Sequence, residues 1–324
     1  MKTLNDKTLA QSLPVTAIIA TKDRAAILGR TLDSLKAQSV VIAEIVVVDG
    51  SRDDQTQQEC LRQAALFETV GGTLIHERAI KLGAAAQRNQ GCFLATQPVL
   101  WFLDDDILLE PECLTRLWLA LQSDSKIGGV NAMITNQCYV SPGRASRLMY
   151  LLLSGHKGPY AGKIIGPCIN LLPEDRDDLP EVIPTDWMNT TCTLYRREAL
   201  PNPPFGSHFT GYSMYEDVTL SATVGKKWKL ANARTARIFH DTQPGSHKSD
   251  PVDLARMAFV NRHYVARHVL NRDGIGYVLS VIVWELFQIA ASLASNQGRR
   301  GIIPGLRGKM NGLFEVLKTK GNHE

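Results

Sequence analysis

The sequence lacks several features that would place it in a special class of protein. Its 324 residues contain no CxxC pair, no internal repeat, no low-complexity tract, and no apolar run of signal-peptide length near the N-terminus. With 44% apolar and 21% charged residues the chain is expected to be globular, which excludes disordered, collagen-like and coiled-coil structures. The six cysteines are scattered among apolar or small neighbours, as buried thiols are, so we expect a reducing, cytoplasmic environment. They are Cys60, Cys92, Cys113, Cys138, Cys168 and Cys192.

Two phosphate-binding motifs are also absent. The first predicted strand is not followed by GxGxxG, and GxxxxGK[ST] does not occur. A dinucleotide-binding fold of the dehydrogenase type and a P-loop are therefore excluded, and any phosphate must be held in another way.

The net charge is small, +4, but it is unevenly distributed. From Lys226 onward there are 16 basic and 7 acidic residues, whereas the preceding 225 residues have a net charge of −5. A basic C-terminal region is typical of a surface that meets polyanions or anionic lipid, although a solvated basic face has the same composition.

Apolar runs and helical spacings alternate through the first third of the chain. The runs are almost wholly apolar, as expected of parallel strands buried on both faces of a sheet. The pattern predicts an α/β fold with a doubly wound, mostly parallel sheet. The predicted strands are 15–20, 42–48, 72–76 and 99–103, and the predicted helices are 25–37, 55–67 and 83–95.

Polar residues follow three of these strands, at the edge where ligands bind in such sheets. The most acidic group is Asp104-Asp105-Asp106, whose like charges repel unless a cation compensates them. One of these carboxylates could bind a nucleotide's ribose and another a divalent metal ion. The alternative is a solvated turn in which Asp106 caps a helix beginning near Pro111. The other two groups are Thr21-Lys22-Asp23-Arg24 and Asp49-Gly50-Ser51.

Two further candidates lie later in the chain. Glu216 and Asp217 begin a predicted helix, where either could act as a general base, but Ser213 and Glu216 also have the spacing of a capping box. His240 follows an apolar pair, which is typical of a structural histidine unless a metal lies near it.

Six motifs follow one another between residues 14 and 240. They are the first strand with Thr-Lys-Asp-Arg, Val-Val-Val-Asp-Gly-Ser, Ala-Gln-Arg-Asn-Gln-Gly, Phe-Leu-Asp-Asp-Asp, Asp-Trp with Tyr-Arg-Arg-Glu-Ala, and Tyr-Glu-Asp-Val-Thr-Leu. In this order they resemble the motifs of family 2 glycosyltransferases with the GT-A fold. The resemblance implies an inverting transfer of a sugar from a nucleotide-diphospho-sugar donor.

The same resemblance implies a role for each matching residue. Asp217 is the catalytic base and Glu216 its neighbour, while Asp106 binds Mn²⁺ or Mg²⁺ and His240 completes the metal site. Trp187 lies on the acceptor side. The nucleotide-sugar donor is bound by Thr21, Asp23, Asp49, Arg88, Asp104 and Asp105. Among these, Asp49 contacts the nucleotide base and Arg88 approaches the nucleotide or its phosphates.

The sequence departs from the family at two places. Asp49 is followed directly by Gly50, where many members have a further Asp or Asn, and the Gln-x-x-Arg-Trp motif of processive synthases is missing. We therefore expect the transfer of one or a few sugars.

The C-terminal region contains the apolar stretch 276–294, interrupted by Glu285. A charge at its midpoint costs about 2.5–3.5 kcal/mol on insertion scales, so spanning is not favoured, and flanking arginines suit an interfacial helix. A buried helix of a soluble appendage is the alternative. We predict an N-terminal extension (1–13), a GT-A domain (14–245) and a basic helical region (246–324). We expect the protein to be peripheral at the cytoplasmic face of the inner membrane, with the basic helical region in contact with the membrane.

The expected partners are a nucleotide-sugar donor and a saccharide or lipid-linked acceptor in bacterial polysaccharide or lipopolysaccharide synthesis, with no nucleic acid. Two alternatives remain open. One is a catalytically silent nucleotide-sugar-binding or scaffold protein of the same fold. The other is a nucleotidyltransferase, although its glycine-rich phosphate loop is missing here.

Overall fold

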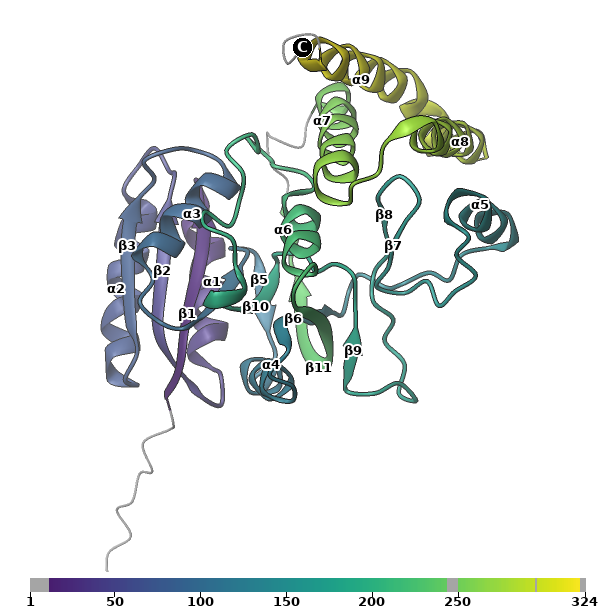
Figure 1. Ribbon diagram of the computed structural model, residues 1–324. Coiled ribbons are helices and arrows are strands. Elements are labelled where there is room, and N and C mark those ends of the chain that lie inside the picture. The colour runs from purple at the N-terminus through teal and green to yellow at the C-terminus, as the bar shows by residue number, and fades with distance from the viewer. Residues whose placement is uncertain (1–11, 244–249, 295, 321–324) are drawn as a thin grey trace, which may run out of the picture.

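The structure is a computed structural model that describes residues 12–243, 250–294 and 296–320. A central sheet carries helices on both faces, and a group of helices from the C-terminal region lies beyond one end of the strands (Figure 1).

The first half of the chain alternates strands and helices as predicted. Its strands β1 to β4 pair in parallel. Strands β1, β2 and β4 are largely buried on both faces between helix layers, whereas β3 lies at the edge of the sheet and is partly exposed. The observed strand β1 begins three residues earlier than predicted, within the predicted N-terminal extension, whose residues 1–11 lie outside the described part. The elements are β1 (Ser12–Thr21), α1 (Ala25–Lys36), β2 (Val41–Asp49), α2 (Gln55–Thr69), β3 (Thr73–Arg78), α3 (Ala84–Leu94) and β4 (Val99–Leu103).

The central sheet continues with strands that follow β4 in the chain, from Ile107 to His240. In the described residues its order is β3-β2-β1-β4-β10-β6-β11-β5, with β9 also paired to β11. Strands β1 to β4 pair in parallel, and so do β6 and β11. Strand β10 is antiparallel to both of its neighbours, β4 and β6. The predicted mostly parallel, doubly wound sheet is therefore confirmed. The added elements are β5 (Ile107–Leu109), α4 (Cys113–Gln122), β6 (Ile127–Ile134), β9 (Val182–Pro184), β10 (Cys192–Arg196), the turn η1 (Arg197–Ala199), α6 (Glu216–Val224) and β11 (Lys229–His240).

Both faces of the sheet are buried. In β4, Trp101 packs against the layer of α1, α2 and α4, whereas Phe102 points to the opposite layer, which contains α3 and α6. This alternation explains why the strand has no polar face in the sequence. Five of the six cysteines are buried as expected, but Cys138 is exposed, so its prediction is wrong. All six are free thiols.

Residues 135–185, for which no element was predicted, contain helix α5 (Arg144–Ser154) and a small hairpin of β7 (Ile164–Ile165) and β8 (Ile169–Asn170). The helix is amphipathic and buries only Met149 and Tyr150.

The C-terminal region is helical, as predicted, in its described residues. It consists of α7 (Pro251–Tyr264), a π-helical turn η3 (Val265–Val269), α8 (Gly274–Leu293) and α9 (Asn296–Lys320). By length and composition α8 could cross a membrane, and only 6% of its apolar window is buried. The alternative of a buried helix is therefore wrong for α8.

Candidate functional site

A cavity of about 1220 Å³ opens beyond the carboxyl ends of β1 and β4. Its lining includes Thr21 from the end of β1, the three aspartates that follow β4, and the start of α6. The hydroxyl of Thr31, on α1, donates to the carbonyl oxygens of Asp105 and Ile107, at 2.8 and 2.9 Å, and so holds the acidic loop in place.

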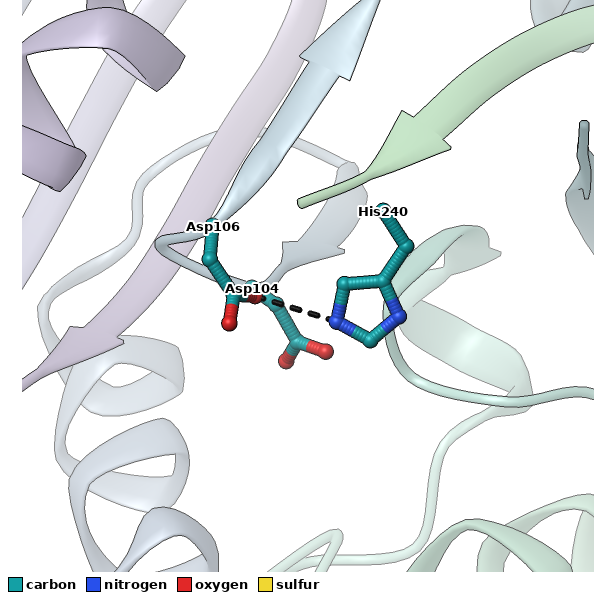
Figure 2. A group of neighbouring side chains, drawn as sticks. All are labelled: Asp104, Asp106 and His240. Carbon is teal, nitrogen blue, oxygen red and sulfur yellow. Dashed lines mark hydrogen bonds and ion pairs between the residues drawn. The ribbon is translucent and has the colours of Figure 1, made fainter. Parts of the chain in front are cut away.

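Asp104, Asp106 and His240 form a cluster with ligand atoms all within 4.8 Å of one another. The antiparallel pairing of β11 with β5 places His240 beside Ile107, directly after the acidic loop. Figure 2 shows the imidazole facing the two carboxylates, and its Nε2 lies 3.1 Å from Asp106 Oδ1. Two carboxylates and one imidazole fit a divalent cation that accepts oxygen and nitrogen ligands.

The charge of Asp106 is already compensated within the protein. Burial alone would raise the pKa of Asp106, but the hydrogen bond from His240 and the guanidinium of Arg24 lower it. Arg24 Nη1 lies 3.2 Å from Asp106 and 3.0 Å from Asp105, and its side chain is 16% exposed. Arg24 therefore occupies the position of a counter-ion at the edge of the metal cluster. Asp106 does not cap α4, which begins at Cys113 without a side-chain cap.

Asp105 is not part of the metal cluster. Its carboxylate accepts a 2.7 Å hydrogen bond from the Thr21 hydroxyl. Burial raises the pKa of Asp105 to about 6, although Arg24 and the Thr21 hydrogen bond partly offset this rise. Asp105 thus ties the end of β1 to the acidic loop, and it lines the cavity with its neighbours.

Arg88, on α3, joins the two acidic groups of the site. Its guanidinium donates to Asp104 at 2.7 Å and to Glu216 on α6, and its side chain is 6% exposed. Burial alone would lower the pKa of Arg88, but Glu216 and Asp104 raise it. Burial also raises the pKa of Glu216 to about 7, against Arg88, which lowers it. Arg88 is therefore an internal counter-ion for both carboxylates.

Asp217 differs from Glu216 in its exposure. Both residues line the cavity, but Asp217 is half-buried, whereas Glu216 is 6% exposed and bonded to Arg88. Burial raises the pKa of Asp217 to about 6, against the backbone N–H of Val218, which donates to Oδ1 at 2.7 Å and lowers it. Asp217 therefore lies in the site as a carboxylate that can accept a proton near neutral pH.

The alternative of a capping box at the start of α6 is wrong. The cap position is held by Tyr215 in a left-handed conformation, with no side-chain capping bond. The Ser213 hydroxyl donates instead to the carbonyl oxygen of Gly211 at 3.3 Å. The turn places Glu216 against Arg88 and leaves Asp217 the more exposed of the two at the cavity.

The remaining candidates lie at different depths. Asp23 and Thr21 line the cavity, but Asp49 and Trp187 are not among the lining residues. The Asp49 side chain is fully buried and accepts from Arg78 at 3.0 Å, with His76 Nε2 3.1 Å away. Trp187 is 6% exposed, and its indole N–H donates to the carbonyl oxygen of Leu171 at 2.8 Å.

Sequence reasoning missed two residues of the site. Arg24 was visible only as part of a turn motif, and nothing local indicated that it would pair with a loop 80 positions away. Gln87 ties two strand ends together, because its amide donates to the carbonyl oxygens of Thr21 and Val48, at 2.9 and 2.8 Å. The sequence signal for Gln87 was its place beside Arg88 in the Ala-Gln-Arg-Asn-Gln-Gly motif.

Comparison with known proteins identifies a family and a shared fold. Residues 16–201 match the model of a family described as glycosyl transferase family 2. No curated protein matches the chain. A mannosyltransferase, PcManGT from Pyrobaculum calidifontis in complex with GDP-Man and Mn²⁺, is similar with a TM-score of 0.57 and 16% identity, over 93% of this chain and 87% of that one. GalNAc-T7 with UDP, GalNAc and Mn²⁺ is similar with a TM-score of 0.53 and 17% identity, over 81% of this chain and 51% of that one. At these identities the likeness shows a shared fold.

Proposed function

The chain belongs to glycosyl transferase family 2, and we propose that it is an inverting enzyme that moves a sugar from a nucleotide-diphospho-sugar to a hydroxyl of a saccharide or lipid-linked acceptor. The observation that carries the proposal is the convergence of two acidic groups on one cavity. The metal-ligand cluster around Asp106 and the half-buried Asp217 both line it.

Asp104, Asp106 and His240 are proposed to hold Mn²⁺ or Mg²⁺. The donor set supports this, and so does the Mn²⁺ in the two structures of similar fold. Bound there, the ion supplies positive charge for a departing diphosphate. Arg24 already contacts Asp106 and lines the same cavity, so its guanidinium can turn from that carboxylate to a phosphate oxygen.

Asp217 is proposed as the general base. The acceptor oxygen bonds to the sugar's C1 while the bond from C1 to the diphosphate oxygen breaks, and the hydroxyl proton moves to the Asp217 carboxylate. Attack from the face opposite the leaving group inverts the configuration at C1, so the base must lie across the sugar from the metal cluster.

Arg88 and Glu216 are proposed to position the catalytic groups. Arg88 donates to Asp104 and Glu216 from a buried position, so it sets the distance between the acidic loop and α6. Arg88 also lines the cavity, so its approach to the donor's nucleotide or phosphates stays a prediction. The Asp49 side chain is buried against His76 and Arg78. We propose that it shapes the pocket for the nucleotide base indirectly, through the conformation of its loop.

A thermal-shift experiment tests the donor site. We expect Mn²⁺ together with one class of nucleotide, among UDP-, GDP-, dTDP- and CMP-sugars, to raise the melting temperature. At a ligand concentration of about 100 times Kd the stabilisation is about 2.7 kcal/mol. Asp106→Asn should remove the metal-dependent part, while Asp33→Asn, an exposed carboxylate on α1 that binds Gln63, serves as a matched control. A folded protein that responds to no donor would contradict the proposal.

Catalysis is tested by acceptor-dependent release of the nucleoside diphosphate. Donor binding without such release, over a panel of saccharide and lipid-linked acceptors, would favour a silent nucleotide-sugar-binding protein. Release of pyrophosphate would instead indicate a nucleotidyltransferase. A role in bacterial surface polysaccharide or lipopolysaccharide synthesis is proposed from the basic, apolar C-terminal region, which is suited to an acceptor held at a membrane.

A further inference from the structure

Helix α8 has one side attached to the protein and one side exposed. Tyr277 is buried and its hydroxyl lies 2.8 Å from His263 Nδ1 of α7, while Glu285 is paired with Arg262 of α7 and Lys309 of α9. Tyr277, Val281 and Glu285 are four positions apart and lie on the same face of α8. Val281 packs in the same apolar cluster as Tyr277. The opposite face carries large exposed apolar side chains: Ile275, Val278, Leu279, Ile282, Leu286 and Leu293.

Helix α9 repeats this arrangement. Gly308 and Gly312 lie directly against α7, since a Cβ at Gly308 would be 2.2 Å from the carbonyl oxygen of Val252 and one at Gly312 would be 3.1 Å from that of Arg256. Residues two positions from each glycine are on the far side of the helix. The exposed apolar residues there are Ile303, Leu306, Met310, Leu313, Phe314 and Leu317.

The charges of these two helices are sorted in the same way. Between residues 274 and 318 the only acidic residues are Glu285 and Glu315, and both are paired with basic residues of α7 or α9. The exposed basic residues Arg299, Arg300, Arg307 and Lys318 accompany the apolar stripes. The outer side of α8 and α9 is therefore apolar and positively charged, which is the pattern of a helix lying in a membrane interface.

The pairing of Glu285 also distinguishes lying on a membrane from spanning it. The carboxylate is held from two other helices, so α8 could enter the bilayer only by breaking both ion pairs and carrying the charge with it. On its α5-facing side, Trp284 and Phe287 pack against a cluster that contains Met149 and Tyr150. Helix α8 is thus held along its length by α5, α7 and α9.

We propose that the exposed faces of α8 and α9 bind flat on the surface of an anionic bilayer, with α8 in the interface and not across it. This surface is connected to the site. Val265 and Val269 of η3 pack with Val218 and Ala222 of α6, and Asn261 of α7 donates to the carbonyl oxygen of Met214 at 2.7 Å. Figure 1 shows the C-terminal helices beyond the same end of the sheet as the start of α6. The acceptor is then a lipid-linked saccharide offered from that bilayer, a step that rests on the proposed function.

Vesicle co-sedimentation of the full chain tests the surface. We expect binding to vesicles of phosphatidylcholine mixed with phosphatidylglycerol, and weaker binding to phosphatidylcholine alone. The double variant Leu286→Glu with Phe314→Glu should bind at least about tenfold more weakly, because both side chains enter the interface. The matched control is Leu61→Glu with Phe93→Glu, which changes a leucine and a phenylalanine that are as exposed, 65% and 89%, on α2 and α3. Equal loss in both double variants would contradict the proposal.

Two further arms separate the alternatives. Arg300→Gln and Arg307→Gln should each weaken binding to the anionic vesicles by about fivefold and leave binding to phosphatidylcholine unchanged. Alkaline carbonate should release the bound protein, and its retention would mean that α8 spans. Dimerisation through these faces in the absence of lipid, lost in the Leu286→Glu and Phe314→Glu variant, would assign the surface to a second copy and overturn the proposal.

The same preparations distinguish this proposal from the proposed function. The melting-temperature shift caused by Mn²⁺ and donor is measured without vesicles, and both double variants should retain it. A retained shift with no vesicle binding refutes the membrane surface alone. Vesicle binding in a protein that responds to no donor refutes the proposed function alone.

Discussion

Replacing Arg88 by methionine should reveal how the two acidic groups are held together. Its buried guanidinium donates to Asp104 and Glu216, and methionine keeps the length of the apolar stem without the charge. Breaking a buried ion pair by removing one partner costs about 3–5 kcal/mol, because the other charge remains buried without compensation. We expect a loss of this size in the free energy of unfolding near pH 8.5.

The loss should depend on pH. The pKa of Glu216 is already raised from 4.5 to about 7 in the presence of Arg88. Since its folded pKa is above its unfolded value, Glu216 destabilises the fold as pH rises through that range, and removal of Arg88 raises the folded pKa further. Near pH 6 Glu216 is protonated in both proteins. The loss in the free energy of unfolding then comes only from unsatisfied hydrogen bonds and from the lost ion pair with Asp104, and it should be about 1–3 kcal/mol.

Urea unfolding followed by tryptophan fluorescence at the two pH values measures this difference. Arg197→Met is the matched control, because the Arg197 guanidinium donates only to backbone carbonyl oxygens, those of Gln97, Cys92 and Ala95. Its loss should be the same at both pH values. An equal loss at both pH values for Arg88→Met, or no recovery when Glu216→Gln is added to it, would refute the reasoning.

Three other predictions concern the reaction and the core. Asp217→Asn should lower turnover by about 10²–10⁴-fold, the range for loss of a general base, without changing the shift in melting temperature caused by the donor. The control Thr219→Val, on the same helix, should leave turnover within a few-fold of the unmodified protein. In the unmodified protein kcat/KM should rise with pH through about 6 and then level, because only the ionised Asp217 accepts a proton; a rate that falls over this range would exclude it as the base. Gly91→Ala should lower the free energy of unfolding by about 1–3 kcal/mol, since its Cβ would lie 2.4 Å from Ile18 Cγ2, and Ile18→Val should restore part of it. Chemical denaturation checks this, and additive losses in the double variant would count against a steric cause.

The sequence alone was sufficient for strands β1 to β4, for the helices between them and for the edge that carries the site, but strands β5, β6, β9, β10 and β11 were not predicted. Apolar runs such as 42–48 are predictable because a strand buried on both faces has no polar position. The acidic loop could be placed because it follows such a run directly. Helix α5 was missed, since it buries only two side chains and its short amphipathic pattern lies among glycines and prolines.

The tertiary structure decided which residues meet. His240 is 134 positions from Asp106, and only the pairing of β11 with β5 brings the two together. The turn at Tyr215, which is left-handed, decided that Glu216 is bonded to Arg88 while Asp217 is the more exposed of the two carboxylates at the cavity. Local periodicity reports how deeply a segment is buried but not against which partner, because a partner is chosen by the packing of the whole chain. For the same reason the amount of apolar surface in α8 was readable from the sequence, but its exposure was not.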